Sequence, residues 1–340
     1  MASLNIFSGF CFARTKLLYY LCKLVFGISV IIKKINKIAM IKKLDELIDA
    51  VKLKGKKRLV AAFANDSHTI GAASMAMDLG VVDATLVGDI DTIKSVCEKE
   101  GIDVNKFNLV QEANEQAAAN KAVELINAGE GDILMKGLCS TDKYMRAILN
   151  KEKGLMPGGK PVLSHVTVFE IPTYHKLLIT SDVAVIPAPD FKQKTAICNY
   201  VITTAKTLGI ETPKVAMIAP TEQMSVGIPS CVDAALIAAM NNRGQIKGAI
   251  VDGPLALDVA IDKESATIKK LKGEVAGDAD CLVWPNIESG NVFYKSCTKF
   301  AKAELAAMVV GAKVPCVLSS RGDSTKTKMY SIALAALSCK

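Results

Sequence analysis

The chain has 340 residues, of which 50% are apolar and 5% aromatic, and its formal net charge is +8. This length suffices for two domains, each with its own core, and the composition is typical of an α/β enzyme. Residues 1–39 contain six basic residues and no acidic one, so the rest of the chain carries a net charge of only about +2. Without a basic stripe or a platform of aromatic side chains, the sequence argues against nucleic-acid binding.

The first 39 residues differ from the rest of the chain. Residues 17–32 are apolar apart from Lys23, but this run is shorter than the roughly 20 apolar residues that a membrane helix needs. No small-residue cleavage site of a signal peptide follows. Met40 then opens a stretch with apolar residues at helical spacing. We therefore expect residues 1–39 to be an N-terminal extension outside the globular fold, with a peripheral membrane anchor as the alternative.

From Met40 onward, short apolar runs alternate with helical stretches. Strands are predicted at 59–64, 85–87, 133–135, 162–168, 183–186, 215–219, 249–251, 281–284 and 314–318. Helices are predicted at 67–79, 114–127, 141–149, 192–207, 231–240, 256–270 and 301–310. This alternation predicts parallel sheets flanked by helices, and the Gly- and Pro-rich stretch 151–161 indicates a break between two domains.

Ten cysteines are scattered singly, without a C-x-x-C pair. This pattern predicts free, buried thiols in a reducing compartment, and hence a cytoplasmic protein. The histidines, His68, His165 and His175, lie far apart in the sequence and lack carboxylates at ligand spacing. The sequence therefore predicts no metal site.

Polar residues follow several predicted strands, at 65–68, 136–141, 252–258, 285–291 and 319–324. Ligands of parallel α/β sheets bind beyond the carboxyl ends of the strands, and helix N-termini attract anions. In the last of these turns, Arg321 offers a guanidinium for phosphate or carboxylate, and Gly322 permits close backbone approach. The alternative explanation is helix capping, which applies to Ser140, Thr141, Ser289 and Ser324.

Other known functional motifs are either absent from the sequence or stand in the wrong structural context. An adhesive Arg-Gly-Asp triplet needs an exposed loop of a secreted protein, whereas 321–323 joins a predicted buried strand to a helix. The stretch 154–161 approaches a phosphate-binding P-loop, but Pro161 stands where Ser or Thr is required and no strand precedes it. There is no G-x-G-x-x-G after a strand and no G-x-S-x-G.

Three C-terminal motifs, DGPLALD (252–258), PNIESGN (285–291) and SRGDSTKTK (320–328), resemble in this order the phosphate acetyl/butyryl-transferase family. LMKG with a following Thr (134–141) and LSHVTVFE (163–170) resemble its phosphate butyryltransferase branch. The resemblance covers about residues 40–340. It implies a reversible reaction in which butyryl-CoA and phosphate give butyryl phosphate and CoA.

The family implies a particular architecture and particular partners. We expect two three-layer α/β domains with parallel-rich sheets and an interdomain cleft, as in isocitrate/isopropylmalate dehydrogenase-like folds. Residues 40–150 with 310–340 would form domain one, and 151–309 domain two. The resemblance further implies a homodimer or higher homo-oligomer, butyrate kinase as the metabolic partner, and CoA as a co-substrate with no bound cofactor.

The resemblance also assigns site residues. In related acetyl-transferring enzymes the Ser-Arg pair of the last turn contacts phosphate and the developing oxyanion, and Ser320 and Arg321 match it. Some of those enzymes use an Asp six residues after the Arg as the base for the CoA thiol. Here that position is Thr327, and Asp323, the nearby acid, is either the base or a helix cap. The expected substrate-binding residues are Lys136, Gly137, Thr141, Asp252, Gly253, Pro254, Asn286, Ser289, Gly290, Asn291, Ser324 and Lys326.

The chemistry needs few groups. Phosphate is anionic at pH 7 and has only to be held in line with the thioester carbonyl, while Arg321 and Ser320 stabilise the tetrahedral intermediate. No acyl-enzyme is needed, so Cys139 and Cys316 are expected to take no part. For Lys326 and Lys328, a solvated helix face is the alternative to phosphate binding.

Three rival functions stay open at this point. An acetyl-specific transferase differs only in the size of the acyl pocket. A metal- and NAD(P)-dependent decarboxylating dehydrogenase of the same fold needs clustered Asp residues and several arginines, and the chain has few arginines. A non-catalytic CoA- or acyl-phosphate-binding protein, tethered by its N-terminal segment, would bind CoA without turnover.

Overall fold

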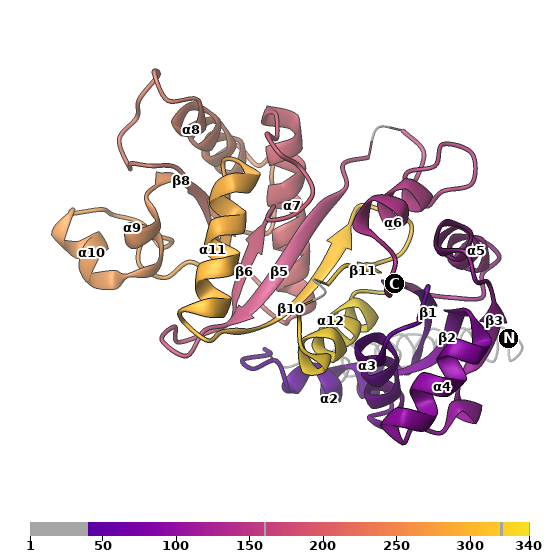
Figure 1. Ribbon diagram of the computed structural model, residues 1–340. Coiled ribbons are helices and arrows are strands. Elements are labelled where there is room, and N and C mark those ends of the chain that lie inside the picture. Colours follow the sequence, from indigo (N-terminus) through magenta and orange to yellow (C-terminus); the bar gives the residue numbers. More distant parts are fainter. Residues whose placement is uncertain (1–39, 160, 320–321, 340) are drawn as a thin grey trace, which may run out of the picture. The chain divides into compact units, whose positions relative to one another are not determined.

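The computed structural model describes residues 40–159, 161–319 and 322–339 (Figure 1). Residues 40–340 form one compact unit. The predictions for residues 1–39 lie outside the described residues. Within the described part of the chain, no helix is long and apolar enough to cross a membrane.

A mixed 11-stranded sheet organises the fold, in the order β3-β2-β1-β4-β11-β10-β5-β6-β9-β7-β8. Its strands are β1 (Lys57–Ala62), β2 (Val82–Gly88), β3 (Asn108–Gln111), β4 (Ile133–Lys136), β5 (Ser164–Glu170), β6 (Leu178–Ser181), β7 (Lys214–Ile218), β8 (Ile250–Leu255), β9 (Cys281–Val283), β10 (Glu304–Val310) and β11 (Cys316–Val317). Neighbouring strands are parallel except where β10 pairs with β11 and β5, and where β5 pairs with β6. The predicted α/β class is confirmed.

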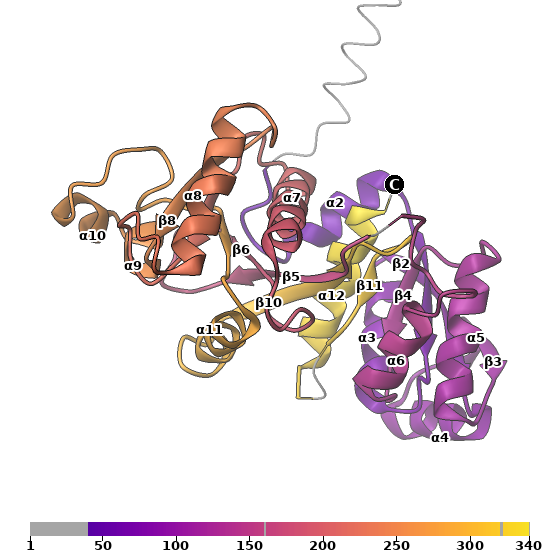
Figure 2. The ribbon, with the colours of Figure 1, turned by 90° about the horizontal axis from the view of Figure 1, so that it is seen from above.

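Helices connect these strands and cover the sheet. They are α2 (Glu46–Lys54), α3 (Ser67–Asp78), α4 (Ile90–Glu100), α5 (Glu115–Asn127), α6 (Thr141–Ile148), α7 (Phe191–Thr207), α8 (Pro229–Asn242), α9 (Leu257–Ile261), α10 (Lys263–Ile268), α11 (Ile287–Lys299) and α12 (Thr325–Ser338), with a 3-10 turn at Val104–Lys106. The last helix, α12, lies beside α3 and α2 from the start of the described chain (Figures 1 and 2). The last helix is therefore packed against the first two helices of the described chain.

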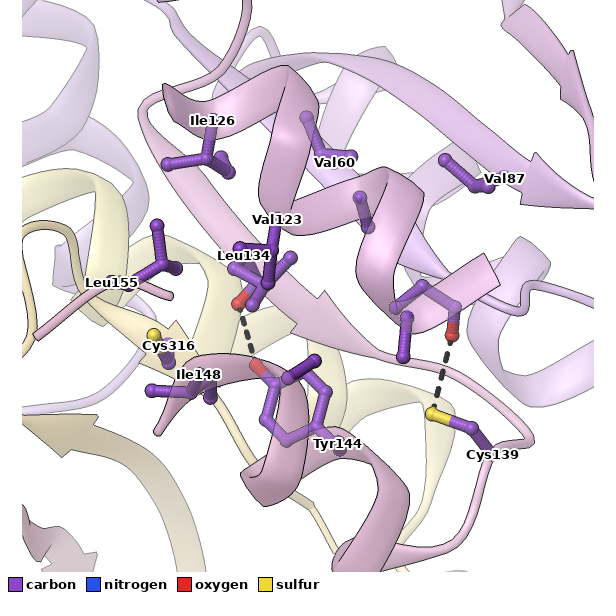
Figure 3. Close-up of a cluster of buried hydrophobic side chains, with 14 of the residues drawn as sticks. Val60, Val87, Val123, Ile126, Leu134, Cys139, Tyr144, Ile148, Leu155 and Cys316 are labelled. Atoms are coloured by element: carbon purple, nitrogen blue, oxygen red, sulfur yellow. Dashed lines mark hydrogen bonds between the residues drawn. The ribbon is translucent and has the colours of Figure 1, made fainter. Parts of the chain in front are cut away.

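One core cluster holds α5 and α6 against the first strands (Figure 3). Val60 and Leu134 contribute from β1 and β4, and Val123 and Ile148 from the two helices. Tyr144 is fully buried, and its hydroxyl donates to the carbonyls of Leu134 at 3.1 Å and Val317 at 3.2 Å. This hydroxyl ties α6 to both β4 and β11, and so fixes the strand ends that lead into the predicted site.

A second core cluster packs α9 and α11 against β5, β7 and β9. Its aromatic side chains meet edge to face: the ring centroids of Phe169 and Tyr294 are 5.6 Å apart, with the planes at 63°. Such contacts fix ring orientation as well as burying apolar area. Tyr294, on α11, also lines the cavity described below.

The predicted helix at 301–310 is wrong, because this segment is strand β10. Its alanines, Glu304 and Leu305 are good helix formers. However, β10 is a central strand paired on both sides, and its residues 305–309 are all buried. Burial on both faces removes the alternation that marks a strand, so that tertiary packing outweighs local propensity.

The predicted strand at 183–186 is also wrong. The strand is β6, just upstream, and 183–186 is a loop around the buried carboxylate of Asp182. The predicted helix at 256–270 is broken into α9 and α10 at Asp262, which caps α10 by accepting the backbone N–H of Ser265. Strand β3 and helices α4 and α11 were not predicted.

Candidate active site

A cavity of ≈ 230 Å³ lies where β11 ends. Among the described residues it is lined by Thr141, His165, Val183, Ala184, Asn291, Tyr294, Lys295, Leu318 and Ser319. Thr141 opens α6 after β4, and Asn291 belongs to α11, so the fold brings two predicted substrate-binding residues to one cavity with Ser319. Those two residues lie outside the described ones, but Ser319 leads directly into them.

A larger cavity of ≈ 340 Å³ lies elsewhere. It is lined by α7, the end of α12 and residues 310–315, which precede β11, whereas the predicted chemistry follows β11. None of the predicted site residues is among its described lining residues. We therefore place the candidate active site in the smaller cavity.

Several predicted site residues act as helix caps. Ser324 caps α12 by accepting the N–H of Thr327 at 3.1 Å. Asn286 caps α11: its Oδ1 accepts the N–H of Ser289 at 3.0 Å and the Ser289 hydroxyl at 2.7 Å. Ser140 caps α6 by accepting the N–H of Lys143 at 3.3 Å. The capping alternative is therefore confirmed for Ser140 and Ser324 and wrong for Ser289, which donates to the cap residue Asn286. The substrate contacts of Ser324, Asn286 and Ser289 stay predictions.

Two lysines are buried beneath the cavity. Lys136, at the end of β4, is 4% exposed and donates to the carbonyls of Gly137 at 3.2 Å and Cys139 at 2.9 Å. Lys328, on α12, is 5% exposed, and its Nζ donates to Ser319 Oγ at 2.9 Å. The alternative that Lys328 lies on a solvated helix face is therefore wrong.

The charges around Lys328 are mixed. Burial lowers the pKa of its ammonium, and the neighbouring Lys136 cation lowers it further, while Asp66 and Asp323 oppose this. The Oδ2 atom of Asp66 is buried and has no hydrogen-bond partner among the described residues. This concentration of buried charge at the edge of a cavity is the kind of arrangement that binds and activates charged substrates.

Lys326 points elsewhere. It is half-exposed, and its Nζ lies 3.0 and 3.1 Å from the carboxylate oxygens of Glu304 and above the ring of Tyr330. For this lysine the solvated helix face describes the side chain correctly. Its role in binding substrate stays a prediction, and the ammonium is paired with Glu304.

His165 is a cavity residue that sequence reasoning missed. It is buried on β5, with its Nε2 3.4 Å from the Leu318 carbonyl and its Nδ1 3.3 Å from Thr167 Oγ1. Burial lowers the pKa of the imidazole, against the opposing charges of Asp182 and Asp323. Nothing in the sequence separated this histidine from an ordinary core residue except its position in LSHVTVFE.

Asp323 interacts with three groups near the cavity. Burial, together with the charge and hydrogen bond of Asp323, raises the pKa of the Tyr294 phenol. The charge of Asp323 also opposes the lowering of the pKa of His165 and of Lys328. Asp323 is not among the described residues that line the cavity, and its role as a base stays a prediction.

At three predicted site residues the packing leaves no room for any side chain larger than that of glycine. A Cβ on Gly137 would lie 2.4 Å from the carbonyl oxygen of Phe63, and one on Gly290 would lie 2.3 Å from that of Asp182. On Gly253 it would lie 2.7 Å from the Met217 Cβ. Close approach of neighbouring chain requires these three glycines without invoking a ligand.

Asp252, Gly253 and Pro254 do not join the other predicted residues. They lie on β8, at the edge of the sheet, with a cis peptide bond between Gly253 and Pro254. Asp252 Oδ1 accepts the N–H of Gly253 at 2.8 Å. None of the three is among the described residues that line the cavity.

Known proteins resemble this chain over most of its length. A family model described as Phosphate acetyl/butaryl transferase matches residues 91–336. The phosphate butyryltransferase of Clostridium acetobutylicum is 47% identical over 298 residues, 88% of this chain and 98% of the relative. The phosphate acetyltransferase of Thermotoga maritima is 40% identical over 294 residues, 86% of this chain and 99% of the relative. A solved branched-chain phosphotransacylase from Enterococcus faecalis has a TM-score of 0.73 at 31% identity, covering 83% of this chain and 98% of its own.

These similarities define an acyltransferase with an α/β fold like that of the phosphotransacylases. The chain belongs to the phosphate acetyl/butyryl-transferase family. Its reaction is acyl transfer between coenzyme A and phosphate. The predicted family and reaction class are confirmed, and the dehydrogenase and non-catalytic alternatives fall away.

Proposed function

We propose that the protein interconverts butyryl-CoA and phosphate with butyryl phosphate and CoA in the cavity at the end of β11. The observation that carries this proposal is the meeting of Thr141, Asn291 and Ser319 at one cavity, immediately before Ser320 and Arg321. The butyryl preference is supported by 47% identity to a phosphate butyryltransferase, compared with 40% to an acetyltransferase.

In the proposed mechanism phosphate attacks the thioester directly. Arg321 and Ser320 hold the phosphate dianion and the developing oxyanion, helped by the N-terminus of α12. The new carbon–oxygen bond forms as phosphate adds, and the carbon–sulfur bond breaks as CoA leaves as a thiolate. The buried Lys136 and Lys328 add positive charge beneath the turn.

In the reverse direction the CoA thiol, with an ordinary pKa of about 8.5, has to lose a proton. We propose Asp323 as the acceptor, since the position of the acetyltransferase base is occupied here by Thr327. The proximity of Asp323 to Tyr294 and His165 supports its placement beside the substrate. No cysteine takes part in this sequence of steps.

We further propose a division into two α/β domains, 40–150 with 310–340 and 151–309, with a substrate cleft between them as in isocitrate/isopropylmalate dehydrogenase-like folds. Two features support this division. The strands β10 and β11 are joined through one registered pair, Val309 with Cys316, and the two core clusters consist of different residues. A cytoplasmic homo-oligomer that supplies butyrate kinase completes the proposal, on the family resemblance alone.

The test is thiol release from butyryl-CoA and acetyl-CoA, with and without phosphate. Phosphate-dependent release that favours butyryl-CoA supports the proposal, whereas faster acetyl-CoA turnover corrects the substrate. Arg321→Ala should lower turnover by about a hundredfold or more, because it removes a donor to the oxyanion. Near-normal turnover in a folded Arg321→Ala protein would overturn the assignment of Arg321.

A further inference from the structure

The lining of the cavity contains both apolar and polar side chains. Val183, 2% exposed, and Leu318, 8% exposed, are its buried aliphatic lining residues, and the buried Tyr294 adds an aromatic ring. His165 and Ser319 are polar lining residues, and Ser319 accepts a hydrogen bond from the buried Lys328. A phosphate needs donors and cations, whereas a saturated chain offers neither and gains from burial against carbon. The aliphatic lining residues are therefore the ones that suit an acyl chain.

The size of the cavity also limits what enters it. Pockets for whole drug-sized ligands occupy roughly 300–1,000 Å³, and this one encloses ≈ 230 Å³. It suits the reacting end of an acyl-CoA, a short acyl chain with the adjoining phosphate, and not the nucleotide. Ala184 and Lys295 also line the cavity, and both residues are exposed.

The loop at residues 182–186, which carries Val183, is fixed by buried hydrogen bonds. Asp182 is 2% exposed, and its Oδ1 accepts the N–H groups of Ala184 at 2.7 Å and Val185 at 2.9 Å. Its Oδ2 accepts the N–H groups of His165 at 3.3 Å and Ile186 at 3.2 Å. A further hydrogen bond, from Asn291 Nδ2 to the Val183 carbonyl at 3.0 Å, fixes the loop from the α11 side.

The loop also lies where the two core clusters meet. Val183 packs in the second cluster, whereas Val185 packs against the first, to which Leu318 belongs. Because both neighbours of the cavity are close-packed, the wall cannot retreat to accept a longer chain without opening a void elsewhere. Such a rigid wall limits the length of the acyl chain that the cavity can accept.

We propose that Val183 and Leu318 form the acyl-chain wall of the active site, and that Val183 with the neighbouring Ala184 sets the preferred chain length among short saturated acyl groups. This inference rests on the proposed function, because it names the subsite that the acyl group of the same reaction occupies. It adds residues to the site that the family motifs do not contain.

The experiment measures kcat/KM for acetyl-, propionyl-, butyryl- and pentanoyl-CoA at saturating phosphate. Val183→Leu narrows the cavity and should lower the butyryl-to-acetyl ratio about tenfold, the effect of a methylene in an apolar pocket. Val183→Ala widens it and should raise the pentanoyl-to-butyryl ratio. Ala184→Leu, introduced at an exposed position that tolerates bulk, repeats the narrowing without disturbing the core.

Val259→Ala is the matched control. Val259 is fully buried in the same core cluster as Val183 but is not among the described lining residues of the cavity. Val259→Ala should lose about as much stability as Val183→Ala, but it should keep the wild-type order of kcat/KM among the four acyl-CoA substrates. A wild-type order in Val183→Leu, Val183→Ala and Ala184→Leu, all folded and active, would overturn the inference and leave the proposed function intact. Absence of phosphate-dependent release from every acyl-CoA in the wild type would overturn both.

Discussion

The Nζ atom of Lys328 donates a hydrogen bond of 2.9 Å to the hydroxyl of Ser319. This contact joins the first turn of α12 to Ser319, the second residue after β11. The charge of Asp323 opposes the lowering of the pKa of Lys328. One buried cation therefore ties the start of α12 to the residue that precedes the predicted catalytic pair Ser320 and Arg321.

Removing the Lys328 cation should lower turnover more than it lowers the stability of the fold. A hydrogen bond from a charged donor contributes about 1.5–3 kcal/mol, so we expect Lys328→Met to lower turnover of butyryl-CoA about tenfold or more. Lys194→Met is the control: Lys194 is 7% exposed, lies in the first turn of α7 and pairs with Asp233 at 2.7 Å, away from the cavity. The control should lose stability and keep turnover. Wild-type turnover in Lys328→Met would contradict the role described.

Gly137→Ala should destabilise the protein through packing. Its new Cβ would lie 2.4 Å from the Phe63 carbonyl oxygen and 2.7 Å from that of Ala62, both backbone atoms that cannot swing away. Overpacking of this kind costs about 1–3 kcal/mol, measurable as a lower midpoint in urea. Gly158→Ala, with no atom within 4 Å of the added carbon, should leave the midpoint nearly unchanged. Equal midpoints for the two variants would refute the packing explanation.

His165 should make stability fall below neutral pH. Burial lowers the pKa of its imidazole in the folded protein, whereas the unfolded chain has the ordinary value of about 6.5. Between these two values the unfolded state binds more protons, so the free energy of unfolding rises with pH in that range and is lost as the pH falls through it. His165→Asn should show a smaller decrease than the wild type between pH 7.5 and 5.5.

The range above neutrality supplies the control for this measurement. Between pH 7.5 and 8.5 an imidazole is neutral in both states, so the wild type and His165→Asn should change in parallel. If the two proteins lost the same free energy of unfolding between pH 7.5 and 5.5, His165 would not be the group responsible.

The thiols next to the site should be unreactive. Burial raises the pKa of Cys139 to about 11 and that of Cys316 to about 12, and Cys139 Sγ donates to the Ala62 carbonyl at 3.6 Å (Figure 3). Because the thiolate is the reactive form, iodoacetamide at pH 8 should leave both cysteines unmodified in the native protein and modify both in urea. Peptide mass mapping distinguishes these outcomes, and rapid native labelling of either would be incompatible with this environment.

Much of the fold could be predicted because local sequence patterns agree with the tertiary packing. Short apolar runs marked β1, β4, β7 and β9, polar residues marked the starts of the helices after β1 and β4, and Ser324 caps α12 as the capping alternative predicted. The family motifs pointed to the residues after β11, and a cavity lies at the end of that strand. Where a strand is buried on both faces, as in β10, the same apolar run fits a helix equally well.

The choice between Lys326 and Lys328 shows why the site was only partly readable. In α12 all residues from Lys328 to Leu337 are buried, so the helix has no polar stripe from which to tell which lysine points inward. His165 and Val183 were missed for a related reason. Both reach the cavity because the fold brings β5 and the loop after β6 to the end of β11, which lies much later in the sequence.

The residues around the cavity differ in how readily they can be substituted. At Gly290 a backbone oxygen fills the space where any side chain would begin, and the carboxylate of Asp182 is committed to the loop that it holds. Val183 and Ala184 differ from both, because their side chains adjoin open volume. Under the proposed assignment of the acyl-chain wall, one or two substitutions at Val183 and Ala184 would change the acyl preference without touching the Asp182 carboxylate or Gly290. Related proteins with this scaffold could then diverge in substrate while remaining folded.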